Sequence, residues 1–132
     1  MFTVILHDAP YTTERSWNGL RFAEKALDNG TPVCVFLFSD AVYVARKGQC
    51  PPDGTPNLED LLIKLVCKGA TVSVCTTCVE ARPYQPSGRS AAGFFHTKES
   101  GLDVGDLVAD VKMGTMAELV NWCRGSQHVV SF

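Results

Sequence analysis

The sequence predicts a three-layer α/β/α sandwich whose mostly parallel sheet has about five strands. Short apolar runs rich in β-branched residues alternate along the chain with longer segments in which apolar residues recur at helical spacing. The apolar runs are nearly continuous, which is typical of strands that are covered on both faces. With 132 residues, 45% of them hydrophobic, the chain fits one compact domain over residues 1–132.

The first two elements are a strand and a helix. Residues 2–7 form an apolar run that ends in a polar residue, so they predict a buried strand. Thr12 or Thr13 can cap a helix that continues through Asn29, because the apolar residues between them keep roughly helical spacing. Gly30 ends this helix, since glycine readily takes the left-handed conformation at a helix C-terminus.

A second strand and helix follow. Residues 32–38 predict a buried strand, and residues 39–45 predict a short helical turn after it. Residues 46–56 contain three prolines and two glycines and therefore predict a loop. Asn57 can cap the next helix, whose apolar stripe stops at Gly69.

The remaining elements complete the alternation. Residues 71–75 predict a third buried strand, and residues 107–111 predict a fourth. Thr115 is expected to cap a helix from residue 116 to about residue 124. Residues 128–132 predict the final strand.

The motif Cys75-Thr-Thr-Cys78 lies where the third strand ends. In parallel α/β sheets, ligands and reactive groups gather at the carboxyl edge of the strands. A cysteine at the start of a helical turn has its pKa lowered below about 8.5 by the free N–H groups, and the thiolate is the nucleophilic form. The sequence therefore predicts Cys75 as a nucleophile and Cys78 as either a resolving or accessory thiol or a packing residue.

Three nearby residues are candidates for supporting roles. Thr76 and Thr77 either donate hydroxyl hydrogen bonds to a thiol or cap the turn. Arg82 either supplies positive charge to the site or is a solvated surface arginine.

Other candidates come from neighbouring strand ends. His7 ends the first strand at the edge that Cys75 shares, so it is either a local base or hydrogen-bond donor, or a polar residue with no part in the chemistry. Tyr11 and the pair Ser39-Asp40 lie in adjacent loops and are expected to line the same pocket.

Metal binding and thiol oxidoreduction are the rival interpretations of the cysteine pair. A structural zinc site needs four ligands, and no second closely spaced pair is found among the other candidates, which are Cys50, Cys67, His96 and Cys123. Cys34 and Cys67 are expected in the core. In a thioredoxin-like protein the motif opens a long helix, whereas Pro83 cuts this helix short. We therefore expect no metal and no cofactor.

Composition limits the possible partners. A formal net charge of −2 predicts no binding to nucleic acid or to an anionic membrane. No apolar stretch approaches the about 20 residues that cross a bilayer, and the first residues do not resemble a signal peptide. A cytoplasmic location is expected. The aromatic residues exceed what a small core needs, so some are expected at a subunit interface: Trp17, Phe94, Phe95 and Trp122.

The order of these motifs resembles the DsrE/DsrF family, also called YchN-like proteins. The resemblance spans almost the whole chain, and its weak stretch lies between residues 83 and 105. The segments that carry it are Pro10-Tyr11, residues 20–27, Gly30, residues 33–45, residues 75–82, residues 116–120 and residues 129–132. Cys75-Thr-Thr-Cys-Val-Glu-Ala-Arg82 is similar to the family's cysteine motif, although Pro83 stands where the family often has glycine.

The resemblance implies a small cytoplasmic sulfur-handling protein. Several members carry sulfur as a cysteine persulfide between donor and acceptor proteins, and they assemble as trimers or hexamers. Their working cysteine corresponds to Cys75, and Cys78 matches the second thiol of the two-cysteine subgroup. The alternative is a non-enzymatic oligomeric subunit whose cysteines are structural or bind zinc.

Overall fold

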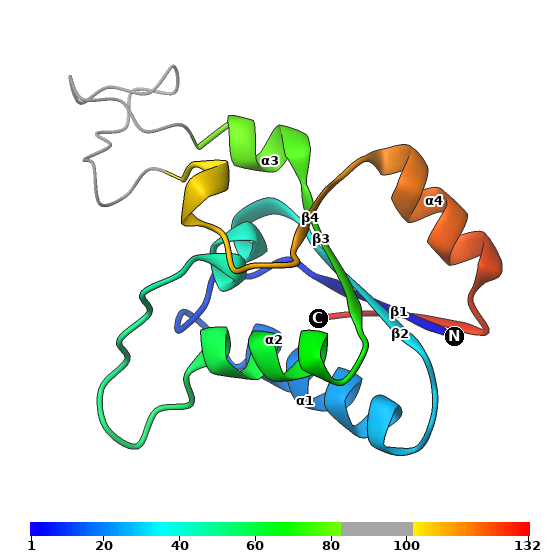
Figure 1. Ribbon diagram of the computed structural model, residues 1–132, viewed down its shortest axis with the longest axis horizontal. Coiled ribbons are helices and arrows are strands. Elements are labelled where there is room, and N and C mark those ends of the chain that lie inside the picture. Colours follow the sequence, from blue (N-terminus) through cyan, green and yellow to red (C-terminus); the bar gives the residue numbers. More distant parts are fainter. Residues whose placement is uncertain (83–101) are drawn as a thin grey trace.

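The computed structural model describes residues 1–82 and 102–132 (Figure 1). Its five strands are all parallel, in the spatial order β4-β3-β2-β1-β5. Their bounds are β1 Phe2–Leu6, β2 Val33–Leu37, β3 Thr71–Cys75, β4 Lys112–Gly114 and β5 His128–Ser131. The predicted mostly parallel sheet of about five strands is confirmed. The expectations for Pro83, Phe94, Phe95 and His96 fall outside the described residues.

Helices cover both faces of the sheet. The helices α1 (Arg15–Asp28) and α2 (Leu58–Cys67) lie together on one face, and α4 (Met116–Gly125) lies on the opposite face (Figure 1). The short helix α3 (Thr76–Glu80) continues directly from the carboxyl end of β3. Two 3₁₀ segments, η1 (Ser39–Ala45) and η2 (Val104–Asp106), complete the described elements. This arrangement confirms the predicted three-layer sandwich.

Local capping signals fix the starts of two helices. Asn57 accepts a hydrogen bond from the backbone N–H of Asp60 at 3.2 Å, and Thr115 accepts one from Glu118 N–H at 3.2 Å. Each side chain satisfies one of the N–H groups that a first helical turn leaves unpaired. Both caps are as predicted.

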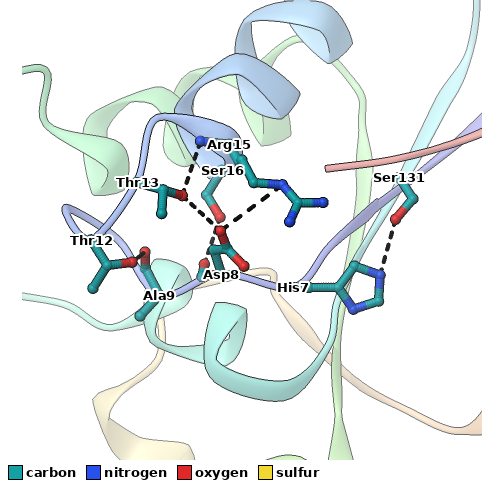
Figure 2. Close-up of polar contacts among 8 residues, drawn as sticks. All are labelled: His7, Asp8, Ala9, Thr12, Thr13, Arg15, Ser16 and Ser131. Atoms are coloured by element: carbon teal, nitrogen blue, oxygen red, sulfur yellow. Dashed lines mark hydrogen bonds and ion pairs between the residues drawn. The ribbon is translucent and has the colours of Figure 1, made fainter.

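The first helix starts slightly later than predicted. Glu14 is the residue that precedes α1, and its side chain makes no capping bond. Thr13 Oγ1 instead links Asp8 to the helix, because it donates to Asp8 Oδ2 at 2.7 Å and accepts from Arg15 N–H at 3.2 Å (Figure 2). Thr12 Oγ1 donates back within the loop, to the carbonyl oxygen of Ala9.

The fourth strand was predicted wrongly. Residues 107–111 contribute a single antiparallel bridge, between Leu107 and Arg46, and the strand itself is β4, which begins at Lys112. Leu107 and Val108 are buried, so their apolar character reflects a loop that packs into the core. Asp110 has a φ of 66°, a turn conformation that interrupts any extended strand at this point.

Two expectations about the other cysteines had different outcomes. Cys34, on the central strand β2, is buried as expected. Cys67 is exposed, which corrects the expectation that it lies in the core. Leu62 and Leu65 form the buried stripe of α2, and Cys67 lies five residues after Leu62, which places it on the other side of the helix.

The core has two parts because side chains alternate along each strand. Val72 and Val74 of β3 belong to the larger cluster, on the face covered by α1 and α2. Cys75 belongs to the smaller cluster with Phe36 and Leu119, on the face covered by α4. The alternation therefore fixes the side of the sheet on which the Cys75 thiol lies.

We predict that Gly114→Ala destabilises the protein. A Cβ atom at Gly114 would lie 2.8 Å from the Cβ of Ser73 and 2.9 Å from both Phe36 Cε2 and Glu118 Oε2. Overpacking of this kind costs about 1–3 kcal/mol in the free energy of unfolding, to be measured by urea denaturation. Gly105→Ala is the matched control, because nothing lies within 4 Å of its added Cβ. Equal stability of the two variants would contradict the packing described here.

Candidate thiol site

The cysteine motif spans the junction between β3 and α3. Cys75 is the last residue of β3 and also the residue that precedes the first turn of α3, with φ −62° and ψ 115°. Cys78 lies inside α3 and is partly exposed, whereas Cys75 is only 5% exposed. The two thiols therefore share one turn of chain but differ in access to solvent.

Hydrogen bonds favour the thiolate form of Cys75. Its Sγ lies 3.2 Å from Thr77 Oγ1. Burial by itself would raise the pKa of Cys75, but hydrogen bonds from the Cys78 thiol, the Thr77 hydroxyl and the backbone N–H groups of Cys78 and Thr77 outweigh it. The pKa of Cys75 is consequently below its ordinary value.

Cys78 has the opposite tendency. Burial raises its pKa, and so does the hydrogen bond that it shares with Cys75. The backbone N–H of Ser39 donates to Cys78 Sγ at 3.3 Å, which acts in the other direction but does not overcome the first two effects. Cys75 therefore loses its proton more readily than Cys78 does. The two thiols of the site therefore differ in environment, and the predicted roles of Cys75 and Cys78 stay predictions.

Arg82 contacts the backbone of the motif. Its Nη1 donates to the carbonyl oxygen of Cys78 at 2.8 Å, and its Nε and Nη2 donate to Asp40 Oδ1 at 3.1 and 2.5 Å. Asp40 belongs to η1, which follows β2, so this ion pair joins α3 to the next loop along the sheet edge. Arg82 thus positions Cys78, and the expectation that Ser39-Asp40 lies in the same region agrees with these contacts.

The two threonines of the motif have different partners. Thr77 Oγ1 lies next to the Cys75 sulfur, whereas Thr76 Oγ1 donates to the carbonyl oxygen of Gly114 at 2.9 Å. The Thr76 bond ties the start of α3 to the end of β4, the strand next to β3 in the sheet. Only Thr77 contacts a thiol.

His7 and Tyr11 lie at the same sheet edge but are engaged elsewhere. His7 Nε2 lies 3.0 Å from Ser131 Oγ (Figure 2), and its ring packs edge-on against Phe38. The Tyr11 hydroxyl donates to Gln49 Oε1 at 2.7 Å and accepts from Leu58 N–H at 3.1 Å. Within residues 1–82 and 102–132, neither side chain makes a hydrogen bond to Cys75 or Cys78.

Sequence reasoning did not identify Phe36, Leu119 and Gly114 as neighbours of the site. Phe36 and Leu119 form the apolar cluster that contains Cys75, and Gly114 is the register partner of Cys75 on β4. The alternation of β2 points Phe36 to one face, but the sequence does not say which helix covers that face. The sequence offered one signal, which is Gly114, the residue before the cap of α4. A glycine in a strand often marks a place where another group approaches closely.

All six cysteines lie in the described part of the chain, and all are free thiols. Among the residues that the structure describes, no group of three or more His, Cys, Asp or Glu side chains converges in a way that could hold a metal ion. In the same residues, no helix is both long and apolar enough to span a bilayer.

Comparison with known proteins identifies the family. The sequence model described as the DsrE/DsrF-like family matches residues 1–132. The chain belongs to the DsrE/DsrF-like family. This confirms the resemblance seen in the cysteine motif and the terminal elements, and the family is linked to sulfur relay.

Relatives of this DsrE/DsrF-like protein occur in archaea and bacteria. The chain is 38% identical over 131 residues to an uncharacterized protein of Methanocaldococcus jannaschii, covering 99% of this chain and 98% of the relative. It is 36% identical over 132 residues to an uncharacterized protein of Methanopyrus kandleri, covering 100% and 93%. Protein YchN of Escherichia coli is 28% identical over 131 residues, covering 98% and 96%.

Solved structures agree with the fold. The crystal structure of the Escherichia coli YchN protein matches with a TM-score of 0.80 and 27% identity, covering 99% of this chain and 97% of that one. A conserved protein of unknown function from Bacteroides thetaiotaomicron matches with a TM-score of 0.58 and 13% identity over 99% and 94% of the two chains. The second likeness concerns the fold alone.

We predict that Thr77→Val slows alkylation of Cys75 near neutral pH. Loss of the hydroxyl removes one hydrogen bond from the thiolate, so the pKa of Cys75 rises and less thiolate is present at a given pH below it. A hydrogen bond to a charged group contributes about 1.5–3 kcal/mol, so the rate at a pH below the pKa of Cys75 should fall about tenfold or more. The measurement is iodoacetamide labelling from acidic to alkaline pH, with peptide mapping to assign the labelled thiol.

Thr76→Val is the matched control for this measurement. It removes the same hydroxyl from the neighbouring residue, whose partner is the carbonyl oxygen of Gly114. The pH profile of Cys75 should stay close to that of the wild type. If both variants shifted the profile equally, the hydrogen bond between Thr77 and Cys75 would not be the cause.

Proposed function

We propose that this protein holds sulfane sulfur as a persulfide on Cys75 and passes it to a partner. The observation that carries the proposal is the set of hydrogen bonds that lowers the pKa of Cys75 at the carboxyl end of β3. Membership in a family linked to sulfur relay supports it. A cytoplasmic location, where thiols stay reduced, and separate sulfur-donor and sulfur-acceptor proteins belong to the same proposal.

The chemistry needs a thiolate twice. In loading, the Cys75 thiolate attacks the outer sulfur of a donor persulfide, a bond forms between the two sulfurs, and the donor leaves as its own thiolate. In unloading, an acceptor nucleophile attacks the outer sulfur on Cys75, which leaves again as a thiolate. Thr77 and Cys78 stabilise the anion of Cys75, so they favour its formation before loading and its departure during unloading.

The burial of Cys75 suits a carrier. At 5% exposure, its Sγ is largely shielded from solvent by the cluster with Phe36 and Leu119. A sulfur–sulfur bond is about 2 Å long, so an added sulfur extends beyond the buried Sγ. The sulfur that holds the transferable atom is thereby shielded from solvent.

The same burial is the observation that favours a second candidate, a non-enzymatic subunit whose cysteines are structural or bind zinc. A buried thiol packed among apolar side chains is a common structural feature. Zinc would need further ligands besides Cys75 and Cys78, and the described residues place no third donor with them. This candidate predicts slow alkylation of both thiols in the native protein.

We further propose that the chain assembles as a homo-oligomer, a trimer or a hexamer. Three apolar side chains on α4 and β5 are exposed: Met116 is 55% exposed, Val120 is 50% exposed and Val129 is 45% exposed. Exposed apolar side chains gathered on neighbouring elements are typical of subunit interfaces.

We predict that incubation with a persulfide donor adds about +32 Da to Cys75. Intact-mass spectrometry with peptide mapping measures the adduct. Cys75→Ser should abolish it, because serine cannot form a persulfide. Cys67→Ser is the control, since Cys67 is an exposed thiol on α2, outside this site. An undiminished adduct in Cys75→Ser would contradict the proposal.

We predict that Val120→Glu shifts the protein from oligomer to monomer in sedimentation velocity, because a buried charge at an interface is strongly unfavourable. Val104→Glu is the matched control, because Val104 is 55% exposed but lies on η2. A wild-type protein that sediments as a monomer, or a Val120→Glu variant with unchanged assembly, would contradict this proposal.

A further inference from the structure

The carrier reaction forms no covalent bond to the sulfur of Cys78. Cys78 lies three residues after Cys75, and residues at this spacing on a helix have Cβ atoms about 5–6 Å apart. A disulfide joins residues whose Cβ atoms are about 3.5–4.5 Å apart, which is slightly less than this spacing. Cys75 precedes the first turn of α3 and has an extended ψ, and Cys78 packs against the small cluster that contains Cys75. A bond between the two sulfurs therefore requires only a small movement of Cys75 and Cys78 toward each other.

Contacts from outside α3 hold Cys78 in this position. The Ser39 N–H donates to its Sγ at 3.3 Å, and Arg82 Nη1 donates to its carbonyl oxygen at 2.8 Å. Asp40, next to Ser39, holds the same Arg82. Of these contacts, the one from the Ser39 N–H bears on reactivity, because it stabilises negative charge on Cys78 Sγ when that thiol loses its proton.

We propose that Cys78 attacks the Sγ of persulfidated Cys75 and releases the outer sulfur as hydrosulfide, leaving a Cys75–Cys78 disulfide. This second activity rests on the proposed persulfide carrier. It would make the chain a persulfide reductase whenever no acceptor removes the sulfur first.

The step balances in atoms and electrons. Cys78 gives up its proton, and its sulfur forms a bond to Cys75 Sγ. The bond between Cys75 Sγ and the outer sulfur breaks, and its electron pair leaves with the outer sulfur, which takes up a proton and departs as hydrosulfide or hydrogen sulfide. The sulfane sulfur is reduced, and the two cysteine sulfurs are oxidised to a disulfide. A dithiol reductant returns the disulfide to two thiols.

The structure favours the inner sulfur as the point of attack. Cys78 packs against the small cluster that contains Cys75, whereas an added sulfur lies about 2 Å beyond Sγ. Attack on the outer sulfur would only move the persulfide to Cys78 and release nothing. The two routes give different products, so they can be separated by experiment.

The experiment uses wild type, Cys78→Ser and Cys67→Ser, each loaded with inorganic polysulfide and rapidly desalted under anaerobic conditions. Each protein is then incubated without added thiol, while released sulfide and intact mass are followed. We expect wild type and Cys67→Ser to lose the about +32 Da adduct and to release one sulfide for each disulfide formed. Cys78→Ser, whose hydroxyl can still donate to Cys75, should keep its adduct at least about tenfold longer.

The outcomes separate this proposal from the carrier function. A wild-type adduct as persistent as that of Cys78→Ser, or an adduct that moves to Cys78 with no sulfide, would overturn the release reaction and leave the carrier function standing. Absence of any adduct on Cys75 in Cys78→Ser would overturn the carrier function itself, and the release reaction with it. Peptide mapping of the Cys75–Cys78 disulfide identifies the expected product.

Discussion

The position of β3 within the parallel sheet fixes the environment of the Cys75 thiol. Hydrogen bonding to β2 on one side and β4 on the other fixes both the register of the strand and the direction in which each side chain points. Cys75 is the last residue of that ladder, opposite Gly114, and it lies on the face covered by α4. A shift of one residue would turn the thiol into the larger core between the sheet and the helices α1 and α2. The place of the turn that carries Cys78 depends on this register.

The two thiols differ because their hydrogen-bond donors come from different parts of the chain. Cys75 receives its donors from the next three residues, so its environment forms as soon as the turn does. Cys78 receives a donor from Ser39, and its carbonyl oxygen is held by Arg82, which pairs with Asp40. The Cys78 environment therefore requires that η1 and α3 be packed together. Local sequence sets the environment of Cys75, and tertiary structure sets that of Cys78.

This division also explains what could be predicted from the sequence. Patterns within a few residues predict the parallel sheet, the caps at Asn57 and Thr115, and the place of Cys75 at the end of β3. The structure agrees with these predictions. The expected strand at residues 107–111 was wrong, because buried apolar residues in a loop have the same composition as a strand. Thr76 and Thr77 are identical in type, and only the approach of β4 gives one of them the Gly114 carbonyl as a partner.

The backbone of Ser39 has a consequence for mutational studies. Its φ of 51° lies in the left-handed region, and its contribution to the site comes from the backbone N–H rather than from the hydroxyl. Replacement of the side chain leaves that donor in place. Alanine substitution at position 39 would therefore leave the hydrogen bond to Cys78 unchanged. The interaction belongs to the backbone, and proline at position 39 would remove it, because proline has no backbone N–H.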